Sequence, residues 1–410
     1  MKTKRIAAGV LCLLLAVSVT GCSFDLFDSA GSFDNVFDWF GGDSSKSGSV
    51  GGFEKTQSSV PAVTDTSELY EYSMKNTLTE KQTVLYNSFI SQIEAYRTEF
   101  LFENEDKDDL KTAYFAVMDD HPEYFWLAKS YVFRSKTMGD YTSITMTPDI
   151  LSEDPAELER ADKEMKSIVS RIVSDARSRG DLYEQVKYVH DYIIDNTDYD
   201  SDILDVLNTE DSKGLVNAST AYGCLYERKA VCSGYSAAFQ LLCSRLGVDC
   251  YRVSGTRVLE SGAHQWNFLK LYDDYYYTDT TWDDPSRADG VKMRTYEYFL
   301  INDSDLARTH TIDDERPVPE CSGTRYNYYV YNGLYFDEYD FRYIEDAASR
   351  DPYASELSVK FSSPEQRDLA EQDLMENKRI FELDGFSGRV SYSLSASGCI
   401  LTIRNDRTEQ

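Results

Sequence analysis

Common metal-binding motifs are missing from this 410-residue sequence, which has no C-x-x-C pair and no zinc-type spacing of cysteine and histidine. It also has no EF-hand loop, and no apolar run beyond residues 1–22 is long enough to span a bilayer. These absences exclude the usual structural zinc sites, the commonest calcium loop and a chain that crosses the membrane several times. We therefore expect no metal and no cofactor, while calcium dependence stays open.

Positive charge is scarce, with 42 lysines and arginines against 71 acidic residues and a formal net charge of -29. A surface of this sign repels nucleic acid and anionic lipid headgroups. We therefore expect neutral or basic partners and no nucleic acid, and the oligomeric state stays open. Acidic pairs such as Asp283-Asp284 favour a solvated acidic face, with a calcium site as the alternative.

The N-terminus carries a targeting pattern in residues 1–22. A positively charged start precedes the apolar run 6–19, and Val19-Thr20-Gly21-Cys22 resembles a bacterial lipobox. We expect cleavage before Cys22 and lipidation of its thiol, which would anchor the protein on the outside of the bacterial cell membrane. An uncleaved anchor is the alternative. Residues 23–64 are rich in glycine, serine and aspartate and predict a flexible linker.

Six cysteines follow Cys22, so one free nucleophile among them leaves an odd number and excludes complete disulfide pairing. Cys232 directly precedes a helical spacing of apolar residues from Tyr235 to Leu246, which Gly247 ends. Unpaired N–H groups and the positive end of the helix dipole favour a thiolate at such a position. The remaining thiols have no histidine partner pattern, so we interpret them as inert and leave their disulfide state open: Cys224, Cys243, Cys250, Cys321 and Cys399.

A histidine and an aspartate follow Cys232 in two consecutive strand patterns, His264 in the first and Asp279 in the second. The short acidic segment between them predicts a β-hairpin. A turn at Tyr272-Asp273 makes the two side chains diagonal neighbours on one face, whereas a turn at Asp273-Asp274 keeps one face but needs a bulge. A thiol, an imidazole and a carboxylate can form a nucleophile, its base and the group that orients the base.

Three ordered motifs surround these residues: K-A-V-C-S-G-Y at Cys232, A-H-Q-W-N at His264 and D-T-T-W-D-D-P from Asp279. They resemble the transglutaminase-like superfamily, which is related to papain-like cysteine proteases. The resemblance covers residues 183–312 and implies that Cys232 is the nucleophile, His264 the base and Asp279 the orienting carboxylate. It also implies an α+β fold, in which a helix bearing the cysteine packs on an antiparallel sheet bearing the histidine and the aspartate.

Three further segments complete the predicted organisation. Residues 65–180 predict a mostly helical N-terminal region, whose first helix starts at a capping box of Thr79 and Gln82. Residues 181–320 form the predicted catalytic core, and residues 321–410 predict a small C-terminal α+β module.

Other polar residues of the core receive no place in the predicted site. We interpret His190 as structural and His310 as part of a polar tail without a chemical role. Asn196 could donate to an oxyanion hole, but we leave it outside the predicted catalytic residues.

The sequence therefore predicts a surface-anchored cysteine enzyme that acts on amide bonds by thiol acyl transfer. Water as the acceptor gives a peptidase or amidase, and an amine gives protein cross-linking; we favour hydrolysis. A protein or a cell-wall peptide is the expected substrate. The alternative is a non-catalytic cell-surface binding module on the same fold.

Overall fold

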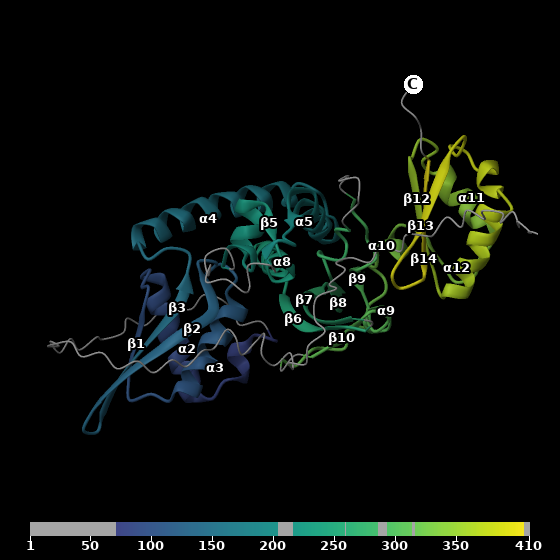
Figure 1. Ribbon diagram of the computed structural model, residues 1–410. Helices are drawn as coiled ribbons and strands as arrows, with labels where there is room; N and C mark the ends of the chain where they lie inside the picture. Colours follow the sequence, from purple (N-terminus) through teal and green to yellow (C-terminus); the bar gives the residue numbers. More distant parts are fainter. Residues whose placement is uncertain (1–70, 204–215, 259, 286–292, 314–315, 406–410) are drawn as a thin grey trace, which may run out of the picture. The chain divides into compact units, whose positions relative to one another are not determined.

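The computed structural model describes residues 71–203, 216–258, 260–285, 293–313 and 316–405 (Figure 1). The predicted signal peptide, the linker and the lipidation site Cys22 lie outside these residues. The described chain divides into a larger unit that ends at Tyr331 and a smaller unit that begins at Asn332.

The larger unit begins with helices and a three-stranded antiparallel sheet in the order β1-β3-β2. Its elements are η1 (Met74–Thr77), α2 (Glu80–Glu94), β1 (Phe100–Glu103), α3 (Lys107–Asp120), β2 (Leu127–Met138) and β3 (Tyr141–Ile150). Helix α2 starts at the predicted capping box, in which the side chains of Thr79 and Gln82 each accept from the other's backbone N–H. Phe89, Phe100 and Tyr114 pack helices and sheet together in one buried cluster. The predicted, mostly helical region thus combines helices with this small sheet.

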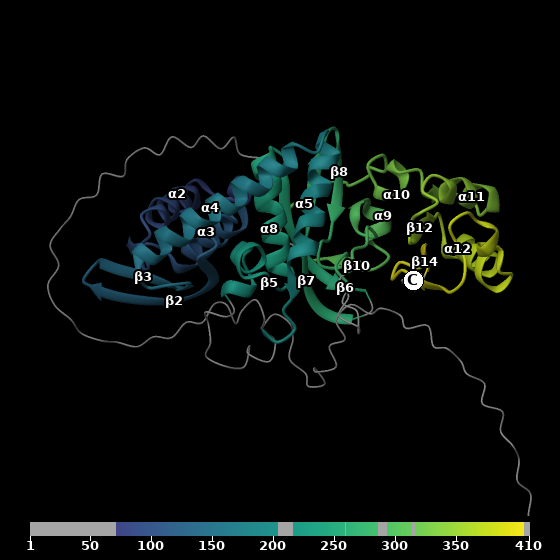
Figure 2. The same ribbon diagram turned by 90° about the horizontal axis from the view of Figure 1, so that it is seen from above.

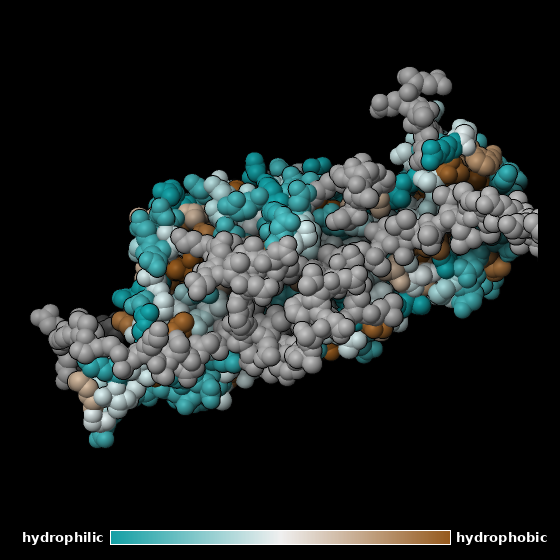
Figure 3. Space-filling model, in the orientation of Figure 1, coloured by the Kyte–Doolittle hydropathy of each residue, from teal (hydrophilic) through white to brown (hydrophobic). Residues whose placement is uncertain are grey.

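Two long helices, α4 (Pro155–Arg177) and α5 (Leu182–Asn196), follow strand β3. Asp154 and Asp181 cap them, each accepting from a backbone N–H of the first turn. Their apolar faces turn inward, and the surface over α4 is mostly hydrophilic (Figure 3). Among the described helices, none is both long enough and apolar enough to cross a membrane.

The core of the larger unit is a five-stranded antiparallel sheet in the order β10-β6-β7-β8-β9. Its strands are β6 (Cys250–Arg257), β7 (Glu260–Leu271), β8 (Asp274–Thr278), β9 (Phe299–Ile301) and β10 (His310–Ile312). Helix α8 (Cys232–Leu246) packs on β6 and β7 and also lies beside α5 (Figure 2). This arrangement confirms the predicted α+β core, with the cysteine-bearing helix on the histidine-bearing sheet. The shorter elements are β4 (Asp198–Tyr199), η2 (Gly223–Glu227), β5 (Lys229–Ala230), α9 (Asp303–Leu306) and α10 (Tyr328–Tyr331).

The smaller unit is an α+β module around a four-stranded sheet in the order β11-β12-β14-β13. Its elements are β11 (Tyr335–Phe336), α11 (Phe341–Ser349), β12 (Glu356–Phe361), α12 (Pro364–Glu371), η3 (Gln372–Glu376), η4 (Arg379–Glu382), β13 (Val390–Leu394) and β14 (Ile400–Asn405). Ile344, Val359 and Ile403 belong to its own buried cluster, which joins the helices to the sheet.

Candidate active site

Cys232 is the first residue of helix α8 and follows Val231 at the N-cap. Its side chain is partly exposed, whereas the other five described cysteines are buried. Gly234 lets this helix end pack closely, because a Cβ there would lie 2.5 Å from the Ala218 carbonyl oxygen and 2.8 Å from the Ala230 Cβ. The thiol therefore lies at a helix N-terminus that is held by close packing and remains accessible to solvent.

The β7–β8 hairpin brings His264 to Asp279, because its two-residue turn is Tyr272-Asp273. Leu271 pairs with Asp274, and Tyr272 adopts the left-handed conformation (φ 56°) that such tight turns use. Of the two turns that the sequence left open, the chain takes the one that needs no bulge. His264 Nε2 and Asp279 Oδ2 are 2.5 Å apart, and both side chains are buried.

Cys232 and His264 lie close enough for each to shift the pKa of the other. Burial raises the pKa of Cys232, but the neighbouring His264, with the backbone N–H of Gln265, lowers it below its ordinary value. Burial lowers the pKa of His264, whereas Asp279 and Cys232 raise it well above its ordinary value. Because His264 Nε2 faces Asp279, Nδ1 is the ring nitrogen that remains to interact with the Cys232 sulfur. These directions favour a thiolate–imidazolium pair.

The carboxylate of Asp279 has four hydrogen-bond donors around it. Oδ1 accepts from the backbone N–H groups of Thr281 (3.0 Å) and Trp282 (3.1 Å). Oδ2 faces His264 and also His310 Nε2, at 3.2 Å. Burial raises the pKa of Asp279, but His264 and then His310 outweigh this effect and hold the pKa well below its usual range. The carboxylate is therefore ionised at neutral pH although it is only 1% exposed.

His310 is a residue of this site that the sequence did not reveal. Instead of lying in a polar tail, it begins strand β10, is buried, and contacts Asp279. The expectation was wrong because a three-residue strand has almost no periodic signal and because β10 pairs with the distant β6. The one local signal is that the exposed Thr311 separates His310 from Ile312, as in a strand with one inward face.

Asp283 does not lie on a solvated acidic face, as the sequence favoured, but is fully buried. Its carboxylate accepts from His190 Nε2 (3.1 Å), Thr295 Oγ1 (2.7 Å) and the Tyr298 backbone N–H (3.1 Å). The other ring nitrogen of His190 lies 3.1 Å from Asp191. Burial lowers the pKa of His190, but the two carboxylates raise it overall. A buried ion pair therefore ties the segment after β8 to helix α5.

Asn196, the candidate oxyanion-hole donor, is exposed and donates to the Tyr192 carbonyl of its own helix at 2.8 Å. Its amide is therefore engaged within α5. The backbone N–H of Cys232, at the start of α8, remains as a candidate donor to an oxyanion.

Within the described part of the chain, one group of side chains matches a metal site by residue type: His264, Asp279 and His310, whose ligand atoms lie within 4.8 Å of one another. Two imidazoles and a carboxylate are ligands typical of zinc. Here these atoms bond to one another, and the 2.5 Å contact between His264 and Asp279 leaves no space for an ion between them. We therefore interpret the group as a hydrogen-bonded network.

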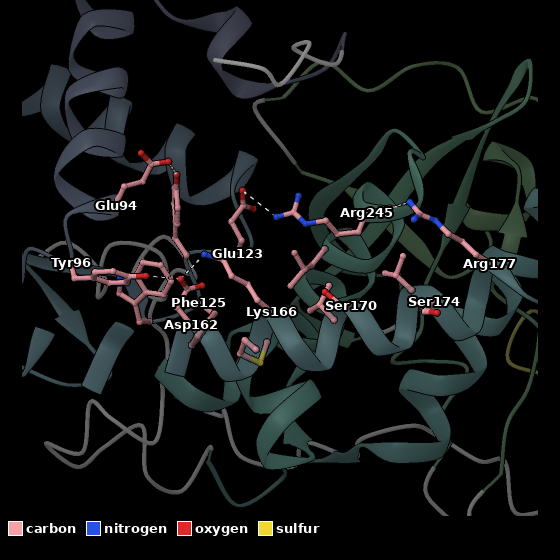
Figure 4. A pocket seen from close by; sticks show the side chains of 16 residues that line it. Glu94, Tyr96, Glu123, Phe125, Asp162, Lys166, Ser170, Ser174, Arg177 and Arg245 are labelled. Atoms are coloured by element: carbon pink, nitrogen blue, oxygen red, sulfur yellow. Dashed lines mark hydrogen bonds and ion pairs between the residues drawn. The ribbon is translucent and has the colours of Figure 1, made fainter. Parts of the chain in front are cut away.

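A separate groove of about 820 Å³ runs along α4 towards the C-terminal end of α8 (Figure 4). Two charged pairs line it: Asp162 accepts from Lys166 at 2.6 Å, and Glu123 lies 3.8 Å from Arg245. Arg245 and Cys232 lie near opposite ends of α8, about 20 Å apart along the helix axis. The groove is therefore distinct from the cysteine site.

Comparison with known proteins gives one family match. Residues 166–282 match the transglutaminase-like superfamily, a span that includes Cys232, His264 and Asp279 but not His310. No curated protein matches this chain.

Two solved structures overlap with parts of the chain. A structure described as a TGase is 17% identical, with 37% of this chain and 44% of that chain covered and a TM-score of 0.26. A candidate cysteine protease from Cytophaga hutchinsonii is 14% identical, with 53% and 75% covered and a TM-score of 0.22. The chain thus spans less than half the length of the first of these proteins.

Proposed function

Because residues 166–282 carry a transglutaminase-like core, we propose that this protein is a cysteine enzyme that acts on amide bonds by thiol acyl transfer. In this proposal Cys232 is the nucleophile, His264 its base and Asp279 the carboxylate that orients the base. The main support is geometric: Cys232 begins helix α8 with a partly exposed side chain, and His264 Nε2 lies 2.5 Å from the buried Asp279 carboxylate. The lowered pKa of Cys232 and the raised pKa of His264 agree with this arrangement. Burial and the neighbouring Cys243 instead raise the pKa of Cys250, so that buried thiol lacks the activation found at the helix start.

The first half of the proposed reaction forms a thioester. The Cys232 thiolate attacks the carbonyl carbon of an amide, and the carbonyl oxygen takes the negative charge. The backbone N–H of Cys232 is positioned to donate to that oxygen. As the C–N bond breaks, His264 gives its Nδ1 proton to the leaving amine, and the acyl group stays on sulfur.

The second half releases the acyl group to an acceptor. Water gives a proton to His264 and attacks the thioester, which yields a carboxylic acid and restores the thiolate–imidazolium pair. An amine in the place of water would give a new amide. We favour water, because the partly exposed thiol of Cys232 leaves the thioester accessible to solvent. The protein is therefore proposed to be a peptidase or amidase rather than a cross-linking enzyme.

We also propose that lipidation of Cys22 anchors the enzyme on the outside of the bacterial cell membrane, where it meets protein or cell-wall peptide. The lipobox-like residues 19–22 and the linker 23–64 support this placement. Cells grown with an alkyne fatty acid should label the protein and retain it in the membrane fraction. Cys22→Ala should lose the label and the membrane association; a variant that keeps both would contradict the anchor.

The enzymatic proposal is tested with the purified chain lacking residues 1–22, a peptide library and an amine tracer, with products identified by mass spectrometry. Hydrolysis adds one water across a cleaved amide, whereas transamidation attaches the tracer. Cys232→Ala should abolish the products, and the matched variant Cys243→Ala, which alters a buried thiol of the same helix, should keep them. Products that persist in Cys232→Ala would refute the proposed nucleophile. A chain that binds peptides and forms no product would instead be the non-catalytic binding module.

A further inference from the structure

His310 and His264 lie on one face of the core sheet, on strands that flank β6. In the register of the sheet His310 is opposite Arg257, and Gly255 is opposite His264. Since alternate residues share a face, these positions all face the same side. A Cβ at Gly255 would lie 2.6 Å from the ring of Trp266. The absence of a side chain at Gly255 therefore leaves room for the Trp266 ring to pack over β6.

The hydrogen bonds of His310 define its tautomer. Thr309 Oγ1 lies 2.8 Å from Nδ1, and Asp279 Oδ2 lies 3.2 Å from Nε2. An ionised carboxylate can only accept, so Nε2 carries the proton and the hydroxyl donates to Nδ1. Burial lowers the pKa of His310, as do the charges of His264 and Arg257, and they outweigh the raising effect of Asp279. His310 is therefore a neutral imidazole that donates to a charged carboxylate.

The site around His310 is closed by aromatic rings. Ring centroids lie 4.5 Å away for Trp282, 4.8 Å for Trp266 and 5.3 Å for Tyr298. Exclusion of water by these rings strengthens the bond to Asp279 relative to an exposed one.

The orientation of the Asp279 carboxylate relative to the sheet is fixed only if a hydrogen-bond donor from outside its own turn contacts it. The donors to Oδ1 are the backbone groups of Thr281 and Trp282, which lie in the same short segment and move with it. The third donor, His264, is the group that must be oriented. His310 is the remaining donor, and β10 holds it to β6.

We propose that His310 is a positioning residue, which holds the Asp279 carboxylate toward His264 by donating from Nε2 to Oδ2. The role rests on the proposed function, because orientation of His264 matters only if it serves Cys232. His310 touches no reacting atom in this scheme.

The first test measures the rate of Cys232 alkylation by iodoacetamide between pH 4 and 9, with EDTA present to remove divalent cations. His310→Leu keeps a similar volume but has no donor, and should move the acid limb of the profile up by about one pH unit, so that alkylation at a pH on that limb slows about tenfold. His310→Gln carries an amide donor near the Nε2 position and should restore most of the rate. Tryptophan fluorescence should show both variants folded.

An unchanged profile in His310→Leu, or an acid limb moved to lower pH, would overturn the positioning role. So would His310→Gln reacting as slowly as His310→Leu. Thr309→Val provides a second route if the leucine variant does not fold, because it leaves the imidazole in place and removes only the hydroxyl. It should shift the acid limb in the same direction by a smaller amount, and an unshifted limb would count against the role.

The second test is independent of reactivity. The chain has four histidines, so ¹⁵N-histidine labelling allows each ring to be followed by NMR. His310 should be a neutral Nε2–H tautomer at pH 7, whereas an Nδ1–H tautomer or a charged ring would refute the assignment. If wild-type Cys232 itself reacts slowly, the proposed function fails. If it reacts rapidly and only the His310 predictions fail, the positioning role alone is lost.

Discussion

Replacing Asp283 with alanine should destabilise the larger unit by about 3–5 kcal/mol, the usual cost of removing one partner of a buried ion pair. The carboxylate is fully buried and accepts from the His190 ring, the Thr295 hydroxyl and the Tyr298 backbone. Its loss leaves a buried imidazolium with one carboxylate and an unsatisfied backbone N–H. Asp283→Asn keeps the volume and an acceptor oxygen, so it should cost less than the alanine variant.

Tryptophan fluorescence in urea is the assay, because Trp126, Trp266 and Trp282 all lie in the larger unit. Asp175→Ala is the matched control, since Asp175 is exposed on α4 and should change stability by less than about 0.5 kcal/mol. An Asp283→Ala variant as stable as this control would refute the reasoning.

The same pair makes a prediction about pH. The pKa of His190 is raised on folding, so its contribution is complete below the unfolded pKa of about 6.5 and is lost as pH rises through the folded pKa. The difference in free energy of unfolding between wild type and Asp283→Ala should therefore become smaller in alkaline solution. A difference that widens there would contradict the charged state of His190.

Two further substitutions test the scaffold of the site. Gly234→Ala should destabilise the chain by about 1–3 kcal/mol and slow Cys232 alkylation, because the added methyl meets a backbone carbonyl that cannot yield; wild-type behaviour would show that the helix end has room. Burial raises the pKa of Asp191, but His190 and Lys187 lower it overall, to about 2. The contribution of the Asp191 carboxylate to the free energy of unfolding is therefore present above about pH 4 and is lost as pH falls towards 2. Asp191→Asn should therefore cost about 2 kcal/mol at pH 7 in urea unfolding, and a cost that stays constant down to pH 2 would contradict the shift.

Local sequence patterns were sufficient to predict the parts of the site that are formed by residues close together in the sequence. The helical spacing after Cys232 and the glycine that ends it predict α8 within a residue. A two-residue turn between the strands also predicts that His264 and Asp279 share one face. Only the position of the turn could not be predicted, because the left-handed conformation of Tyr272 is set by the pairing of the two complete strands.

Distant contacts explain what the sequence could not reveal. Asp283 belongs to a pair of adjacent acids, a pattern typical of exposed surface, and its burial depends on His190, which lies 93 residues earlier. His310 is the first residue of a three-residue strand that pairs with β6, more than 50 residues earlier in the sequence. A single sequence carries no periodic signal for either contact, since both depend on where other elements pack.

The central claim is that His264 activates the thiol of Cys232, and thiol reactivity tests it most directly. The purified chain is treated with iodoacetamide at neutral pH, and each cysteine is followed by mass spectrometry. We predict that Cys232 reacts far faster than the buried Cys243, and that His264→Ala slows Cys232 without changing Cys243. Equally slow labelling of both thiols in the folded wild-type protein would contradict the account.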